Sequence, residues 1–172
     1  MKHLFLTGRI QVGKSTLIQK WLSRCSVQTG GFYTKKEPER DGCIFVHILR
    51  ADMNDTFRDD NILFDCRHRD EENAVALFNV LGTQTLDNAD NYQLVIMDEI
   101  GYMESQAEDF QKAVLRVLDK DTPVLGVVRE YRSPFLDEVR SRPDVTVLEV
   151  TEENRDELAL TLPDILKPFE IR

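Results

Sequence analysis

Cysteine, glycine, proline and histidine are all scarce in this chain, and each shortage excludes a class of protein. The 172 residues include 8 Gly, 6 Pro, 3 Cys and 3 His, which argues against collagen-like, proline-rich disordered and disulfide-framework proteins. The histidines lack metal-ligand spacing. Cys25, Cys43 and Cys66 are odd in number and widely spaced, so we expect three reduced thiols.

Long apolar runs are also missing, and positive charge is in deficit. No apolar stretch approaches the about 18 residues that cross a bilayer, and no signal peptide precedes the first apolar segment. The net charge of −9 argues against a nucleic-acid or anionic-membrane partner, which would select clustered Lys and Arg. We expect one cytoplasmic domain spanning residues 1–172, and the charge identifies no protein partner.

What the chain does have is a complete phosphate-loop pattern near its amino end. Residues 8–15 fill every defined position of GxxxxGK[S/T], directly after the apolar run 4–6 and before an amphipathic helix. The glycines let backbone N–H groups turn toward phosphate oxygens, the lysine reaches the β- and γ-phosphates, and the hydroxyl binds Mg²⁺. The predicted nucleotide-binding residues are Gly8, Arg9, Ile10, Gln11, Val12, Gly13, Lys14, Ser15 and Thr16.

A second motif, of the Walker B type, is an apolar run, 94–97, that ends in Asp98 and Glu99. An acid at the end of a buried strand beside the phosphate loop can hold Mg²⁺ together with the loop hydroxyl, so Ser15 and Asp98 are the predicted metal ligands. The following glutamate can orient and deprotonate the attacking water. Glu99 is therefore the predicted general base.

Arg129 follows another apolar run, 124–128, whose end is where open α/β sheets bind ligands. It could contact the γ-phosphate, and a solvated or salt-bridged side chain is an equal alternative. The candidate catalytic residues are Lys14, Glu99 and Arg129.

The segment from Asp98 to Gly101 also fits the DxxG pattern of GTPases, in which the glycine N–H contacts the γ-phosphate. No NKxD stretch for recognising guanine occurs in the chain. The sequence therefore favours broad tolerance of the base.

Apolar periodicity predicts the remaining elements. We expect strands at 27–34 and 43–49 joined as an antiparallel hairpin, one more strand at 62–64, a helix at 71–86, and strands at 123–128 and 145–150. Ser105 and Glu108 form a possible capping box, a short helix begins at Pro134, and the last helix should bend or end near Pro163. The predicted fold is a three-layer α/β P-loop NTPase fold with a mostly parallel sheet and an antiparallel hairpin insert.

The phosphate loop, the segment GFYT at 31–34 and the segment DEIGYME at 98–104 together resemble the thermophile-type nucleoside-triphosphatase family, also called cancer-related nucleoside-triphosphatases. The resemblance covers nearly the whole chain. It implies a Mg²⁺-dependent enzyme that cleaves the γ-phosphate of ATP, GTP or other nucleoside triphosphates. The chain departs from the family at Arg9–Gln11, where Pro-Gly is common, at Ser15 in place of threonine, and at Tyr102 in place of a frequent lysine.

Two alternatives remain open at this point. A small-molecule or nucleotide kinase uses the same loop and could use the arginines of 129–142 as a lid. A nucleotide-binding regulatory module, in which hydrolysis is incidental, could dock a partner through its acidic surface.

Overall fold

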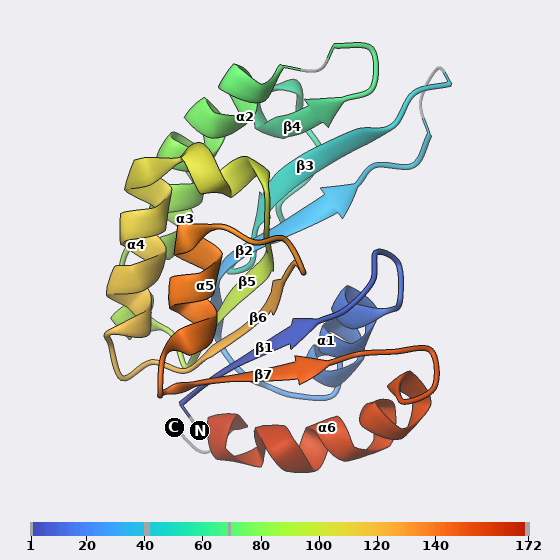
Figure 1. The fold of residues 1–172 in the computed structure, drawn as a ribbon, viewed down its shortest axis with the longest axis vertical. Helices are drawn as coiled ribbons and strands as arrows, with labels where there is room; N and C mark the ends of the chain where they lie inside the picture. Colours follow the sequence, from blue (N-terminus) through green and yellow to red (C-terminus); the bar gives the residue numbers. More distant parts are fainter. Residues whose placement is uncertain (1, 40–41, 69, 171–172) are drawn as a thin grey trace.

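One seven-stranded sheet organises the chain in the computed structural model, which describes residues 2–39, 42–68 and 70–170. The strand order is β4-β3-β2-β5-β6-β1-β7 (Figure 1). The strands are β1 (His3–Thr7), β2 (Thr29–Lys36), β3 (Phe45–Arg50), β4 (Ile62–Asp65), β5 (Leu94–Ile100), β6 (Val124–Val128) and β7 (Val145–Glu149). The helices are α1 (Lys14–Leu22), α2 (Glu71–Leu77), α3 (Thr83–Leu86), α4 (Glu108–Leu118), α5 (Pro134–Ser141) and α6 (Arg155–Glu170).

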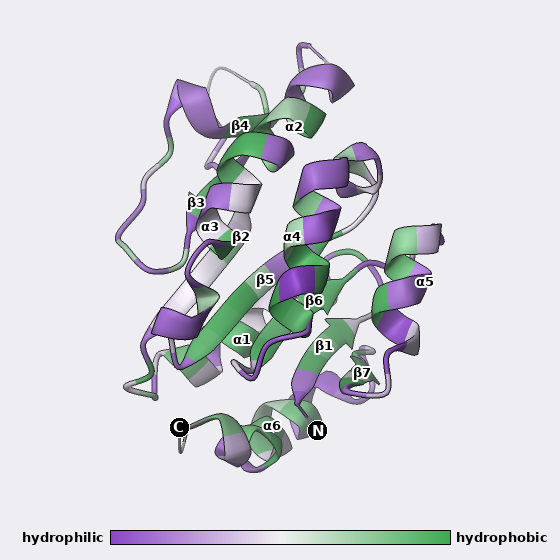
Figure 2. Cartoon of the chain, turned by 90° about the vertical axis from the view of Figure 1, so that its left-hand side faces the viewer, coloured by the Kyte–Doolittle hydropathy of each residue, from purple (hydrophilic) through white to green (hydrophobic). Residues whose placement is uncertain are grey.

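The sheet is covered on both faces, which explains why most residues of its central strands β5 and β6 are apolar (Figure 2). Side chains on successive strand positions point to opposite faces. In β1, Phe5 joins a core packed against α2, α3, α4 and α5, while Leu4 and Leu6 join a second core packed against α1 and α6. The predicted three-layer α/β fold is confirmed.

The predicted hairpin forms, but it is larger than expected. β2 pairs antiparallel with β3, and β3 pairs antiparallel with β4, so the antiparallel edge includes the short strand expected at 62–64. β2 also pairs in parallel with β5, which makes it part of the main sheet. The connection between β2 and β3 was expected to be the charged segment 35–42; its residues 40–41 lie outside the described residues.

Two helix boundaries differ from the prediction. The capping box does not form, because the hydroxyl of Ser105 donates to the carbonyl of Tyr102 in a short 3-10 turn (Met103–Gln106). α4 therefore begins at Glu108 without a side-chain cap. We expected the last helix to bend or end near Pro163, and it does not end there, since α6 continues through Pro163 to Glu170. Burial of Leu162, Leu166 and Phe169 in the second core outweighs the hydrogen bond that a proline removes from a helix.

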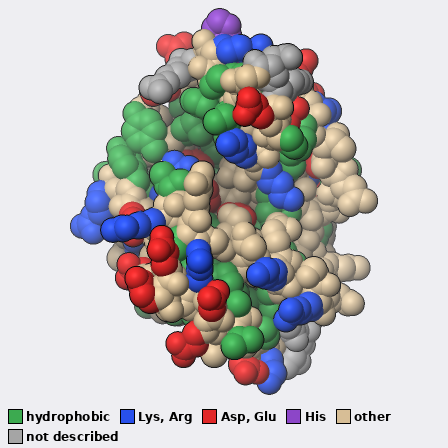
Figure 3. Space-filling view, turned by 90° about the vertical axis from the view of Figure 1, so that its right-hand side faces the viewer, with side chains coloured by type: hydrophobic (Ala, Val, Ile, Leu, Met, Phe, Trp, Pro, Cys, Tyr) green, Lys and Arg blue, Asp and Glu red, His purple; other side chains and the backbone are tan. Residues whose placement is uncertain are grey.

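Parallel strands share one direction, so β1, β2, β5, β6 and β7 all end at the same side of the molecule. This face is hollowed in its middle and carries side chains of both charges around the hollow (Figure 3). Ligands of open α/β sheets bind at such carboxyl ends.

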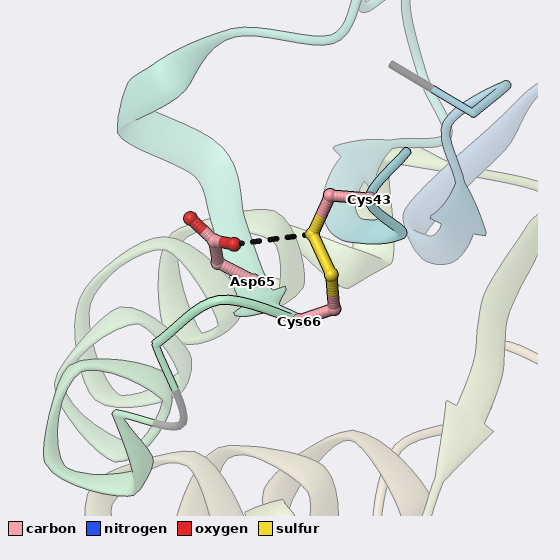
Figure 4. Close-up of side chains that lie close together, drawn as sticks. All are labelled: Cys43, Asp65 and Cys66. Carbon is pink, nitrogen blue, oxygen red and sulfur yellow. Dashed lines mark hydrogen bonds between the residues drawn. A yellow bond between two sulfur atoms is a disulfide. The ribbon is translucent and has the colours of Figure 1, made fainter. Parts of the chain in front are cut away.

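The expectation of three reduced cysteines is wrong for two of them. Cys43 and Cys66 form a disulfide with a Cα–Cα distance of 5.8 Å (Figure 4), while Cys25 keeps its thiol. The pairing of β3 with β4 causes this, because Phe45 lies opposite Asp65 and the flanking residues are carried together. Contact across two strands cannot be deduced from a sequence separation of 23 residues.

Candidate functional site

The loop between β1 and α1 has the backbone shape that a phosphate site needs. Gly8 and Gly13 adopt φ of 130° and 112°, values that side chains disfavour. A methyl group on Gly8 would lie 2.2 Å from the carbonyl oxygen of Val150, so glycine is required where the loop packs on β7. A methyl group on Gly13 would meet nothing within 4 Å, and there the dihedral angle alone favours glycine. The N-terminus of α1 follows, with its unpaired N–H groups.

Lys14 lies folded over this loop. Its Nζ donates to the carbonyl oxygens of Gly8 at 2.6 Å and Arg9 at 2.7 Å. Only 6% of Lys14 is exposed, and burial lowers its pKa, while the carboxylates of Glu99 and Glu130 act in the opposite direction. The ammonium group is thus already desolvated beside the expected position of the phosphates.

Ser15 and Asp98 meet although 83 residues separate them. The hydroxyl of Ser15 donates to Oδ1 of Asp98 at 2.8 Å. Asp98 lies at the carboxyl end of β5, is 2% exposed, and has its pKa raised to about 6 by burial. The hydrogen bond from Ser15 favours the charged form and limits that rise. The two predicted metal ligands therefore form one oxygen-donor pair.

Glu99 lies next to this pair and is held on two sides. Its backbone N–H donates to Oγ1 of Thr34, near the end of β2, at 3.2 Å. Its carboxylate forms an ion pair with Nε of Arg129. Arg129 is therefore salt-bridged in this structure.

A cavity of about 320 Å³ opens between the loop and Glu99. Its lining includes most of the predicted nucleotide-binding residues: Ile10, Gln11, Gly13, Lys14, Ser15 and Thr16. Gly8, at the start of the loop, is buried.

Arg9 and Val12 instead line a neighbouring cavity of about 280 Å³ beside the turn after β7. The other lining groups are mostly acidic and include Glu130, Glu149 and Glu152. Arg9 therefore lines a cavity together with several carboxylates, which accommodates an arginine in the loop segment where the family commonly has Pro-Gly.

The glycine of the DxxG pattern, Gly101, has a partner inside the protein. Its N–H donates to Oε2 of Glu104 at 2.9 Å and so is engaged within the protein. Glu104 is 3% exposed, and burial raises its pKa to about 7. In this arrangement Gly101 does not have the free N–H that a GTPase switch glycine presents to the γ-phosphate.

Sequence reasoning assigned no role to Thr34 or Glu104, although both belong to the motifs that carried the family resemblance. The signal was present in the motifs GFYT and DEIGYME. The motifs alone did not reveal these contacts, because they depend on the parallel pairing of β2 with β5. That pairing places Tyr33 opposite Asp98 and so brings β2 to the site.

A phosphate loop between β1 and α1, whose Ser15 hydroxyl donates to Asp98 near the carboxyl end of the buried strand β5, defines a P-loop protein. The family model described as NTPase matches residues 3–162. The chain belongs to this nucleoside-triphosphatase family, which confirms both the family and the enzyme class predicted from the motifs.

Relatives of the same length support the assignment. The nucleoside-triphosphatase THEP1 of Thermotoga maritima is 30% identical, with 95% of each chain covered. The mouse cancer-related nucleoside-triphosphatase homolog is 34% identical, covering 96% of this chain and 95% of that protein. The match therefore spans the phosphate loop, the sheet and the last helix together.

Two solved structures share the fold. The crystal structure of THEP1 from Aquifex aeolicus has a TM-score of 0.72 at 23% identity, covering 96% of this chain and 99% of that chain. The solution structure of a human cancer-related nucleoside triphosphatase has a TM-score of 0.65 at 28% identity, covering 98% of each. Within the described part of the chain, no helix combines the length and apolar character that a bilayer span requires.

Proposed function

We propose that this chain is a Mg²⁺-dependent phosphohydrolase that converts nucleoside triphosphates to diphosphates and inorganic phosphate, with broad tolerance of the base. One observation carries the proposal: the hydroxyl of Ser15 lies 2.8 Å from the carboxylate of Asp98, with Glu99 next in the chain. It supports a single site in which the phosphate loop, the proposed metal ligands and the proposed base Glu99 act together.

The donor set fits Mg²⁺, which prefers hydroxyl and carboxylate oxygens in partly hydrated sites. Ser15 and Asp98 would hold the ion, which would supply positive charge to offset that of the triphosphate. The loop N–H groups and the ammonium of Lys14 bind the triphosphate. Glu99 accepts the proton of the attacking water, while Arg129 exchanges its contact with Glu99 for the γ-phosphate.

The kinase alternative is weakened by what the arginines of 129–142 contact. Arg140 donates to the carbonyls of Arg129 and Tyr131, and Arg142 pairs with Asp119 and Asp144. Arginines held within the protein make a poor mobile lid. If the chain were a kinase, labelled γ-phosphate would appear on an acceptor instead of in water.

The third alternative, a regulatory module with incidental hydrolysis, predicts slow turnover that rises when a partner protein is added. The desolvated Lys14 and the base already beside the loop support ordinary turnover by the chain alone.

The test is release of inorganic phosphate from ATP, GTP, CTP and UTP with and without Mg²⁺. We expect Lys14→Ala to lower the rate by about 10²-fold to 10³-fold, because it removes a charged donor from the phosphates. Lys20→Ala is the matched control, an exposed lysine on the same helix that should retain the wild-type rate. Equal release by wild type and Lys14→Ala would contradict the proposal.

A further inference from the structure

The turns that follow β5 and β6 contact each other beside the site. The backbone N–H of Arg129 donates to the carbonyl of Ile100 at 3.0 Å. The rings of Tyr102 and Tyr131 meet edge to face with centroids 5.1 Å apart. The position of the Arg129 side chain therefore depends on the turn after β5.

Gly101 forms the surface on which Arg129 lies. A methyl group on Gly101 would be 2.7 Å from Cδ of Arg129 and 3.1 Å from Cγ, so the arginine stem packs directly on the glycine. From there the guanidinium reaches Glu99. A displacement of Gly101 would therefore move the Arg129 side chain and break its ion pair with Glu99.

Glu104 fixes Gly101. Its buried carboxylate accepts the N–H of Gly101 at 2.9 Å, and its backbone carbonyl accepts from Nε2 of Gln111 in α4 at 2.9 Å. A buried carboxylate without a partner is costly, so this hydrogen bond is strongly determined. Glu104, Gly101, Arg129 and Glu99 also line one small cavity of about 40 Å³.

We propose that Glu104 is a positioning residue for the hydrolytic reaction. Through the N–H of Gly101 it holds the turn that seats the Arg129 stem and thereby sets the guanidinium beside Glu99. Glu104 touches neither the phosphate loop nor the cavity in front of it. The inference rests on the proposed role of Arg129.

Three variants test this link in the full chain. Glu104→Ala removes the acceptor, and we expect kcat to fall about 10²-fold, as misplacement of a reacting group does, with KM within about 3-fold of wild type. Glu104→Gln keeps an oxygen for the N–H of Gly101 and should restore kcat to within about 3-fold of wild type. Gly101→Ala, which leaves Glu104 intact, should lower kcat about 10-fold by displacing the Arg129 stem.

A double-mutant cycle separates positioning from general destabilisation. In an Arg129→Ala background, Glu104→Ala should cause little further loss of kcat, because its effect passes through the arginine. Full additivity would overturn the inference. Glu108→Ala, an exposed glutamate at the start of α4, is the matched control.

An NMR measurement needs no activity. The Nε–H signal of Arg129, assigned by its loss in Arg129→Lys, should shift in Glu104→Ala and remain in place in Glu104→Gln. An unmoved signal in a folded Glu104→Ala protein would overturn the inference. If wild type released no phosphate, the proposed function would fail, and this measurement would still decide the positioning link.

Discussion

The parallel part of the sheet and its antiparallel edge are built from similar strands, yet they contribute differently to the candidate site. Each of β1, β5 and β6 ends at one side of the molecule in a proposed site group: the phosphate loop, Asp98 with Glu99, and Arg129. β3 runs the opposite way. At this antiparallel edge the disulfide joins residues that flank β3 and β4, and His47 of β3 makes a buried contact with Asn61 at 2.7 Å. Strand direction thus separates the part that can gather reactive groups from the part that secures the fold.

Glu99→Gln gives the largest effect and tests the parallel part. We expect nucleotide binding to remain and hydrolysis to slow by about 10²-fold to 10⁴-fold, the contribution of a general base. Single-turnover phosphate release and equilibrium binding of nucleotide would measure the two effects separately. Glu138→Gln on α5 is the control, since that exposed carboxylate lies outside the site. Unchanged turnover in Glu99→Gln would remove the residue from the mechanism.

Reduction of the disulfide tests the edge. The link closes a loop with a sequence separation of 23 residues, so its loss should lower the free energy of unfolding by about 3 kcal/mol. Urea denaturation of wild type with and without reductant measures this. Phosphate release should change less than about 2-fold, because the proposed site residues lie on other strands.

Cys43→Ser with Cys66→Ser should match the reduced wild type, and Cys25→Ser is the control thiol replacement. If reduction abolished hydrolysis in a folded protein, the separation of the edge from the site would be wrong.

The smallest effect concerns pH and the stability of the parallel part. His3 in β1 is fully buried, its Nε2 lies 3.0 Å from the carbonyl oxygen of Leu118, and burial lowers its pKa from 6.5 to about 4. As the pH falls, the imidazole of His3 binds a proton in the unfolded chain before it does so in the folded one. The free energy of unfolding therefore keeps its full value above pH 6.5 and decreases as the pH drops toward 4. After allowance for solvent screening, the loss should be about 2 kcal/mol.

Urea denaturation of wild type and His3→Gln at pH 7, 6, 5 and 4 measures that loss, because glutamine keeps an N–H donor for Leu118 but does not titrate. As the pH falls, the free energy of unfolding of wild type should drop relative to that of His3→Gln. A constant difference between the two proteins would show that His3 is not responsible.

The sequence predicts the parallel part better than the edge, for a physical reason. Runs such as 94–97 are apolar because two helical layers cover them, and the acids that follow are positioned by strand direction alone. The disulfide and the site contact of Thr34 depend on which strands pair, which local patterns do not encode. The continuation of α6 past Pro163 was missed because the burial of Leu166 and Phe169 is a tertiary effect that local proline chemistry ignores.

The folded-back side chain of Lys14 has a consequence for how substrate enters. Two main-chain oxygens already hold the ammonium where an incoming anion needs it, so most of the dehydration cost is met when the protein folds. Capture of a triphosphate then exchanges neutral acceptors for charged ones without a search among side-chain conformers. This pre-organised lysine favours rapid binding over a slow rearrangement.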